Sequence, residues 1–156
     1  MKLYTSYWAQ VRNFPPNLVG LNTTIWPPKW RPLGKDNREV WVIDCPPLKP
    51  GPSCDGLCRG DCNPKHPENC QFLINYYNQL RNIDIRDFFE RLVKLKNKME
   101  NEEKIKDISF AFIVFETPSN KCSERVMIHL WLKDWGVEVE EWIKPDNIGK
   151  KSMQSF

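Results

Sequence analysis

The sequence predicts an α/β protein with a small, mainly parallel sheet, flanking helices and a cysteine-rich metal-binding loop. The main observation is the apolar run at 108–116, which is typical of a strand buried on both faces of a parallel sheet. A polar loop follows it, and apolar residues at helical spacing then lead to a second strand candidate at 137–143. Strand, helix and strand in this order form a β-α-β unit, whose ligands usually lie beyond the carboxyl ends of the strands.

The helix of this unit is predicted by its apolar spacing and by the glycine after it. Gly136 should end the helix, because glycine adopts the left-handed conformation that is common after a last helical turn. Residues 137–143 alternate apolar and acidic side chains, which favours a strand near a sheet edge. The apolar positions of the helix are Met127, Ile128, Trp131, Leu132 and Trp135.

Further elements are predicted before the central strand. Residues rich in Tyr, Trp, Val and Ile favour strands at 2–8, 18–25 and 39–43. Apolar periodicity predicts a helix over 70–81 and a second one that starts after Asp84, whose side chain can cap it.

Length and composition fit one domain. The chain has 156 residues and a net charge of +3, which is too small to identify a partner. No apolar stretch approaches the roughly 20 residues that span a bilayer, and the first residues lack the apolar core of a signal peptide. We therefore expect a cytoplasmic α/β domain over 1–144, a flexible tail over 145–156 and no membrane contact.

Four cysteines lie close together in the sequence, at Cys54, Cys58, Cys62 and Cys70, with glycines and prolines between them. Four thiolates complete the tetrahedral shell of a structural zinc site, so this grouping predicts bound zinc. Their spacing differs from the common two-residue knuckle. The alternatives are an iron–sulfur cluster on the same thiolates and reduced cysteines without a metal, and His66 could replace one cysteine.

A proline-rich stretch carries two tryptophans, Trp26 and Trp30, followed by Arg31. Prolines lack the backbone donor and restrict the residue before them, so this stretch should be a loop. One interpretation is that the tryptophans cover the core. The other is that these three residues form an aromatic and cationic wall for a nucleotide or nucleic acid.

The loop after the central strand contains three candidate catalytic residues, Cys122, Arg125 and Glu116, and one candidate ligand-binding residue, Ser123. Cys122 and Ser123 precede the helix, Arg125 lies in its first turn, and Glu116 ends the strand. A helix N-terminus attracts an anion and lowers the pKa of a thiol placed there, and an arginine can hold an oxyanion. Glu116 is a candidate acid or base, and Glu124 is another. The alternative is structural, with the cysteine as a packing residue, the serine as a cap and the arginine as an ion-pair partner.

These residues resemble the bacterial and phage family called domain of unknown function 488, over most of 1–143. The resemblance rests on the opening Leu3-Tyr-Thr-Ser-Tyr7, the strand end at Glu116, the Cys122 to Arg125 loop and the segment 137–142. The family commonly has Cys-His-Arg at this loop, whereas this chain has Cys-Ser-Glu-Arg. The resemblance implies an α/β fold in a bacterial or phage-infected cell and implies no established reaction.

Two functions of different classes follow. The first is an enzyme or anion-binding site at the Cys122 loop, which acts on a nucleotide, nucleic acid or other phosphorylated ligand. The second is a binding module without chemistry, whose tryptophan loop and zinc loop contact nucleic acid or a protein partner.

Overall fold

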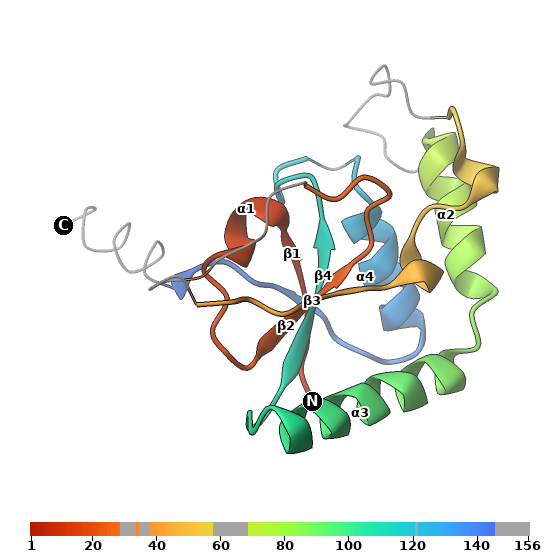
Figure 1. Cartoon of the computed structure of the whole chain (residues 1–156). Helices are drawn as coiled ribbons and strands as arrows, with labels where there is room; N and C mark the ends of the chain where they lie inside the picture. Colours follow the sequence, from red (N-terminus) through yellow and green to blue (C-terminus); the bar gives the residue numbers. More distant parts are fainter. Residues whose placement is uncertain (29–33, 35–37, 58–68, 121, 146–156) are drawn as a thin grey trace.

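The computed structural model describes residues 1–28, 34, 38–57, 69–120 and 122–145, which form an α/β fold around a five-stranded sheet (Figure 1). All neighbouring strands are parallel, and their order across the sheet is β3-β2-β4-β1-β5. The predicted α/β class with a parallel sheet is therefore confirmed. The strands are β1 (Leu3–Tyr7), β2 (Leu18–Asn22), β3 (Val42–Asp44), β4 (Ser109–Val114) and β5 (Glu140–Glu141).

Helices cover both faces of the sheet. α1 (Trp8–Val11) lies on one face, while α2 (Gln71–Arg81), α3 (Ile85–Glu102) and α4 (Glu124–Asp134) contribute to the core on the other. In Figure 1, α4 lies between the sheet and α2, and α3 runs below the sheet. Two 3₁₀ turns, η2 (Pro46–Leu48) and η3 (Pro52–Cys54), connect β3 to the segment before α2.

The predicted central strand is confirmed as β4, which lies in the middle of the sheet. Its side chains alternate between the two cores: Phe110, Phe112 and Val114 pack with α2, α3 and α4, whereas Ala111 and Ile113 pack with α1. All five are fully buried, which explains the continuous apolar run. The neighbouring strand β2 approaches closely, since a Cβ on Gly20 would lie 2.4 Å from Cδ1 of Ile113.

The helix boundaries follow the predicted caps. The Asp84 carboxylate accepts hydrogen bonds from the backbone of Arg86 and Asp87 at the start of α3. Gly136 follows α4 with φ +75°, and its N–H donates to the carbonyl of Lys133. The next N–H, that of Val137, donates to Leu132, so α4 ends in a Schellman motif.

All five strands are shorter than their predicted ranges, and three of them differ by more than the end residues. β2 ends at Asn22, because the Asn22 side chain accepts the backbone N–H of Thr24 at 2.9 Å and turns the chain. β3 covers Val42–Asp44 rather than 39–43. The predicted edge strand at 137–143 pairs with β1 only at Glu140–Glu141, although the N–H of Trp142 still donates to the carbonyl of Thr5.

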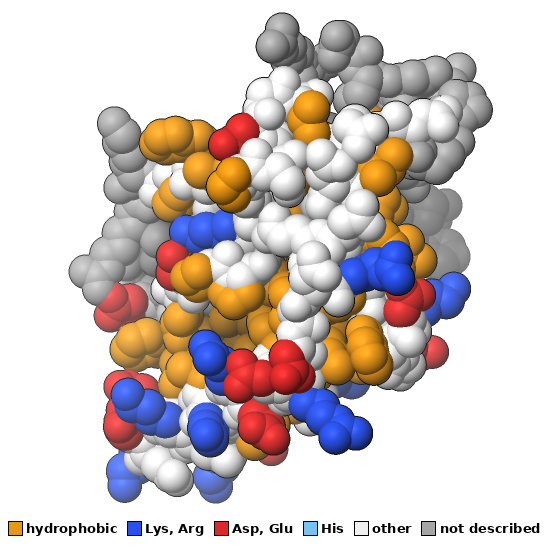
Figure 2. Space-filling model, turned by 90° about the vertical axis from the view of Figure 1, so that its right-hand side faces the viewer, with side chains coloured by type: hydrophobic (Ala, Val, Ile, Leu, Met, Phe, Trp, Pro, Cys, Tyr) orange, Lys and Arg blue, Asp and Glu red, His pale blue; other side chains and the backbone are white. Residues whose placement is uncertain are grey.

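None of the helices in the described ranges has the length and the apolar character needed to cross a membrane. Acidic and basic side chains are mixed along the lower part of the face in Figure 2, where α3 lies. The tail over 146–156, and with it most of the predicted flexible segment, lies outside the described residues.

Candidate functional site

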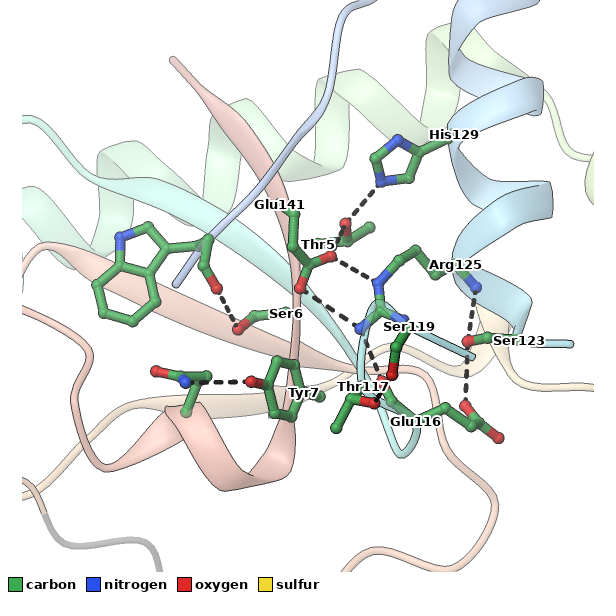
Figure 3. Close-up of polar contacts among 12 residues, drawn as sticks. Thr5, Ser6, Tyr7, Glu116, Thr117, Ser119, Ser123, Arg125, His129 and Glu141 are labelled. Atoms are coloured by element: carbon green, nitrogen blue, oxygen red, sulfur yellow. Dashed lines mark hydrogen bonds and ion pairs between the residues drawn. The ribbon is translucent and has the colours of Figure 1, made fainter. Parts of the chain in front are cut away.

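A buried ion pair lies at the carboxyl end of the sheet, between α4 and the edge strand. Nε of Arg125 donates to Oε1 of Glu141 at 2.5 Å, and Nη2 lies 3.4 Å from Oε2 (Figure 3). Nη2 also donates to the backbone carbonyl of Glu116 at 2.8 Å. The side chains of Arg125 and Glu141 are only 8% and 17% exposed. The guanidinium therefore holds three segments together: the end of β4, the start of α4 and β5.

A threonine of β1 extends this ion pair to a histidine. Thr5 lies directly beside Glu141 in the sheet register, and its hydroxyl donates to Oε1 of that carboxylate at 2.8 Å. The same oxygen of Thr5 lies 2.6 Å from Nε2 of His129, on the second turn of α4. Burial raises the pKa of Glu141, and the bonds from Thr5 and Arg125 oppose that shift.

The start of α4 is capped by a side chain that also contacts the strand end. Oγ of Ser123 accepts the backbone N–H of Arg125 at 3.3 Å and donates to Oε2 of Glu116 at 3.0 Å. Just before it, the N–H of Cys122 donates to Oδ1 of Asn120 at 2.9 Å. Ser123 is therefore a helix cap that orients the Glu116 carboxylate, and Arg125 is an ion-pair partner.

A cavity of about 240 Å³ opens beyond the carboxyl ends of β2 and β4. Four residues predicted for ligand binding or catalysis line it together: Trp26, Glu116, Cys122 and Glu124. Cys70 contributes from the start of α2. Its remaining walls come from Thr24, Ile25, Pro50, Phe72, Leu73 and Phe115.

One carboxyl group of this cavity has a strongly raised pKa. Burial, followed by the nearby negative charge of Glu116, raises the pKa of Glu124 from its ordinary value of 4.5 to about 7. The Glu116 carboxylate instead accepts a hydrogen bond from Ser123. Near neutral pH, Glu124 can therefore donate a proton beside a second carboxylate, and such a pair can divide the roles of acid and base.

The remaining predicted residues are only partly described. Trp26 is 81% exposed at the rim of the cavity, while Trp30 and Arg31 lie outside the described residues, as do Cys58 and Cys62. Among the described residues, no group of three or more His, Cys, Asp or Glu is arranged to hold a metal. Cys54, at the end of η3, is buried, and Cys70 lies at the N-cap of α2.

Three polar residues of the site were not predicted from the sequence: Thr5, His129 and Glu141. A signal for Glu141 is present, because two-residue alternation places it on the same face as Val137 and Val139, which are partly buried. A carboxylate on a buried face needs a partner. The positions of Thr5 and His129 carry no comparable signal, since their contacts join residues more than a hundred positions apart.

Comparison of the chain with protein-family models, with curated proteins and with solved structures finds no match. The resemblance to domain of unknown function 488 therefore stays a prediction. The function of this protein is therefore inferred from the geometry of the site.

Loss of one partner of the buried ion pair should strongly destabilise the protein. Glu141→Gln leaves the Arg125 charge buried without its counter-ion, so we expect a loss of about 3–5 kcal/mol in the free energy of unfolding. Urea denaturation measures it. The matched control is Arg91→Met, which removes the exposed pair with Asp87 and should cost less than about 1 kcal/mol. Equal losses in both variants would contradict the role given to the Arg125–Glu141 pair.

The raised pKa of Glu124 should make stability fall as the pH rises. Between about 4.5 and about 7 the unfolded chain has lost this proton while the folded protein retains it, so the folded state loses stability across that interval. In Glu124→Gln, the free energy of unfolding should decrease by roughly 2–3 kcal/mol less than in the wild type across this pH interval. The measurement is urea denaturation at several pH values, with the exposed Glu90→Gln as control. Parallel stability profiles for wild type and Glu124→Gln would show that burial does not perturb this carboxyl.

Proposed function

We propose that this protein is an enzyme that acts by acid–base chemistry on a small neutral ligand bearing a ring, such as a nucleoside. The observation that carries the proposal is the convergence of Trp26, Glu116, Cys122 and Glu124 on one cavity beyond the ends of β2 and β4. Carboxyl ends of parallel strands are the usual ligand sites of open α/β sheets. The cavity suits a single ring system rather than a dinucleotide.

The charges around the cavity favour a neutral ligand over a phosphorylated one. Glu116 and Glu124 both line it, so a phosphate would meet two acidic groups. The charge of Arg125, the residue expected to bind an anion, is balanced by Glu141, and Arg125 does not line this cavity. A nucleotide or another phosphorylated ligand therefore requires a cation that these described residues do not supply to the cavity.

The residues of the cavity divide naturally into roles. The ring of Trp26 stacks on the ligand, since an exposed tryptophan offers an apolar face at the rim. Glu124 donates a proton to the leaving group as the glycosidic bond breaks, and Glu116 accepts a proton from the water that forms the new bond to the sugar carbon. In the alternative, the thiol of Cys122 gives its proton to Glu116 and forms that bond, and water then hydrolyses the covalent intermediate. Cleavage of a glycosidic bond is the reaction that a pair of carboxylates serves most directly.

A second candidate is a binding module without chemistry, which the 81% exposure of Trp26 favours. In that case the ring contacts nucleic acid or a protein partner, and the thiol and carboxylates only shape the surface. Binding would then survive Cys122→Ala and Glu124→Gln and depend on Trp26, Trp30 and Arg31 instead. The mixture of acidic and basic side chains over α3 provides no single-sign patch on that face for nucleic acid (Figure 2).

The cysteine-rich loop is proposed to bind zinc close to this cavity. The described ends of the loop are held near each other, because Nδ2 of Asn75 on α2 donates to the carbonyl of Ser53 beside Cys54 at 2.7 Å. Cys70, the N-cap of α2, lies five residues before Asn75 and lines the cavity. A metal held by Cys54, Cys58, Cys62 and Cys70 would therefore stabilise one wall of the site, with an iron–sulfur cluster as the alternative.

A nucleoside should bind more tightly than its own 5′-monophosphate. The negative charge of Glu116 repels the phosphate, and the charge of Glu124 adds to this repulsion once the pH exceeds about 7, so we expect about a tenfold difference in Kd at pH 8. Titration calorimetry with uridine and adenosine, and with their monophosphates, measures this difference.

Trp26→Ala should weaken nucleoside binding by roughly tenfold or more without loss of folding, because this ring is exposed.

Release of the base from a bound nucleoside tests the chemistry. Glu124→Gln should retain nucleoside binding and lose base release, whereas Glu90→Gln should retain both. Tighter binding of the monophosphate would overturn the proposed ligand class. Nucleoside binding without base release in the wild type would favour the binding module.

Purified protein should contain about one zinc per chain, which elemental analysis measures. Cys54→Ser should lose the metal and lower the melting temperature, because structural metal binding contributes to folding. Cys122→Ser is the control, since this residue lies outside the loop, and it should keep the metal. Metal-free protein, or zinc retained in Cys54→Ser, would contradict the zinc site, and iron absorption would indicate a cluster.

A further inference from the structure

A second cavity, separate from the Cys122 cavity, lies along α4. It is an open groove of about 640 Å³ between α4 and the segment that leads into β5. It shares no lining residue with the cavity at the ends of β2 and β4. Most of its wall is apolar, from Val126, Leu130, Val137 and Val139, and His129 also lines it.

Hydrogen bonding to β1 determines which ring nitrogen of His129 carries the proton. Glu141 accepts bonds from both Thr5 and Arg125, so the hydroxyl proton of Thr5 is directed at Glu141. The oxygen of Thr5 therefore acts as an acceptor toward Nε2 of His129, 2.6 Å away. Nε2 must carry the proton, and Nδ1 is left with a lone pair.

Nδ1 is directed away from this network. The two ring nitrogens of an imidazole point in nearly opposite directions, and Figure 3 shows the second nitrogen of His129 turned away from Thr5. Within the described part of the chain, the Thr5 contact is the hydrogen bond that this side chain makes. Burial and the charge of Arg125 lower the pKa of His129, which keeps the ring neutral near pH 7.

The charged side chains that line the groove are exposed to solvent. They are Lys133 on α4, Glu138 just before β5, and Glu140 in β5. Arg125 and Glu141 are paired with each other beneath His129. Within the described part of the chain, the groove therefore combines an apolar wall with one neutral imidazole, and its charged side chains are exposed.

We propose that this groove is a second ligand site, in which Nδ1 of His129 accepts a hydrogen bond from a small neutral molecule with an apolar body and an O–H or N–H group. Apolar walls with a single well-oriented polar group are the usual composition of small-molecule sites. The ion pair and Thr5 hold the acceptor in place before the ligand arrives. This inference does not rest on the proposed function of the Cys122 cavity.

The tautomer of His129 can be measured directly by long-range ¹H–¹⁵N correlation spectroscopy. The chain has two histidines, so His66→Gln leaves His129 as the only imidazole signal. We expect Nε2 to carry the proton and Nδ1 to show the shift of a lone-pair nitrogen at neutral pH. A proton on Nδ1, or a ring that is charged at pH 7, would overturn the proposal.

Phenol and anisole test the ligand class, because they share an apolar ring and only phenol donates a hydrogen bond. Phenol should bind about two- to tenfold more tightly than anisole and should move the Nδ1 signal. Thr5→Ser keeps the hydroxyl and should keep this preference. Thr5→Val removes the hydroxyl that directs the tautomer and should reduce the preference.

Equal affinity for phenol and anisole, or a phenol effect that leaves the Nδ1 signal unchanged, would overturn the proposed role of His129. The spectrum of Thr5→Val also reports whether that variant is folded. If Thr5→Val is unfolded, the affinities of wild type and Thr5→Ser for phenol and anisole still decide the ligand class.

Discussion

The buried ion pair between Arg125 and Glu141 is the interaction on which the rest of the site depends. An isolated charge cannot be buried at acceptable cost, so the start of α4 and the edge strand must meet with both groups correctly placed. β5 pairs with β1 at only two residues, and such a short strand gains little from its own backbone hydrogen bonds. The ion pair and the Thr5 hydroxyl therefore help to set its register.

The Arg125–Glu141 pair also influences the polar groups of both cavities that adjoin α4. Because Glu141 balances Arg125, the charges that line the cavity at the ends of β2 and β4 are those of Glu116 and Glu124. On the other side, the same carboxylate orients Thr5, which in turn selects the proton position of His129. One arginine thus leaves an acidic cavity at the start of its helix and a neutral acceptor in the groove along it.

The candidate site could be predicted in part, because its parts follow local rules. Glu116 and Cys122 follow the central strand, and strands of a parallel sheet present such residues at one edge. The interpretation of Arg125 as an anion-binding group was equally compatible with the sequence. Its buried partner lies sixteen residues away on strand β5, and no local pattern distinguishes a guanidinium that faces solvent from one that faces Glu141.

The sequence by itself determined the α/β class, the central strand and the helix caps. These features depend on apolar periodicity and on side chains within a few residues, as with Asp84 at α3 and Gly136 after α4. Only the tertiary structure decided which residues meet: Trp26 with Cys122 in one cavity, and Thr5 with His129 beside the other. The physical reason is that burial and charge pairing act between segments far apart in the chain, and these contacts are established only when the sheet assembles.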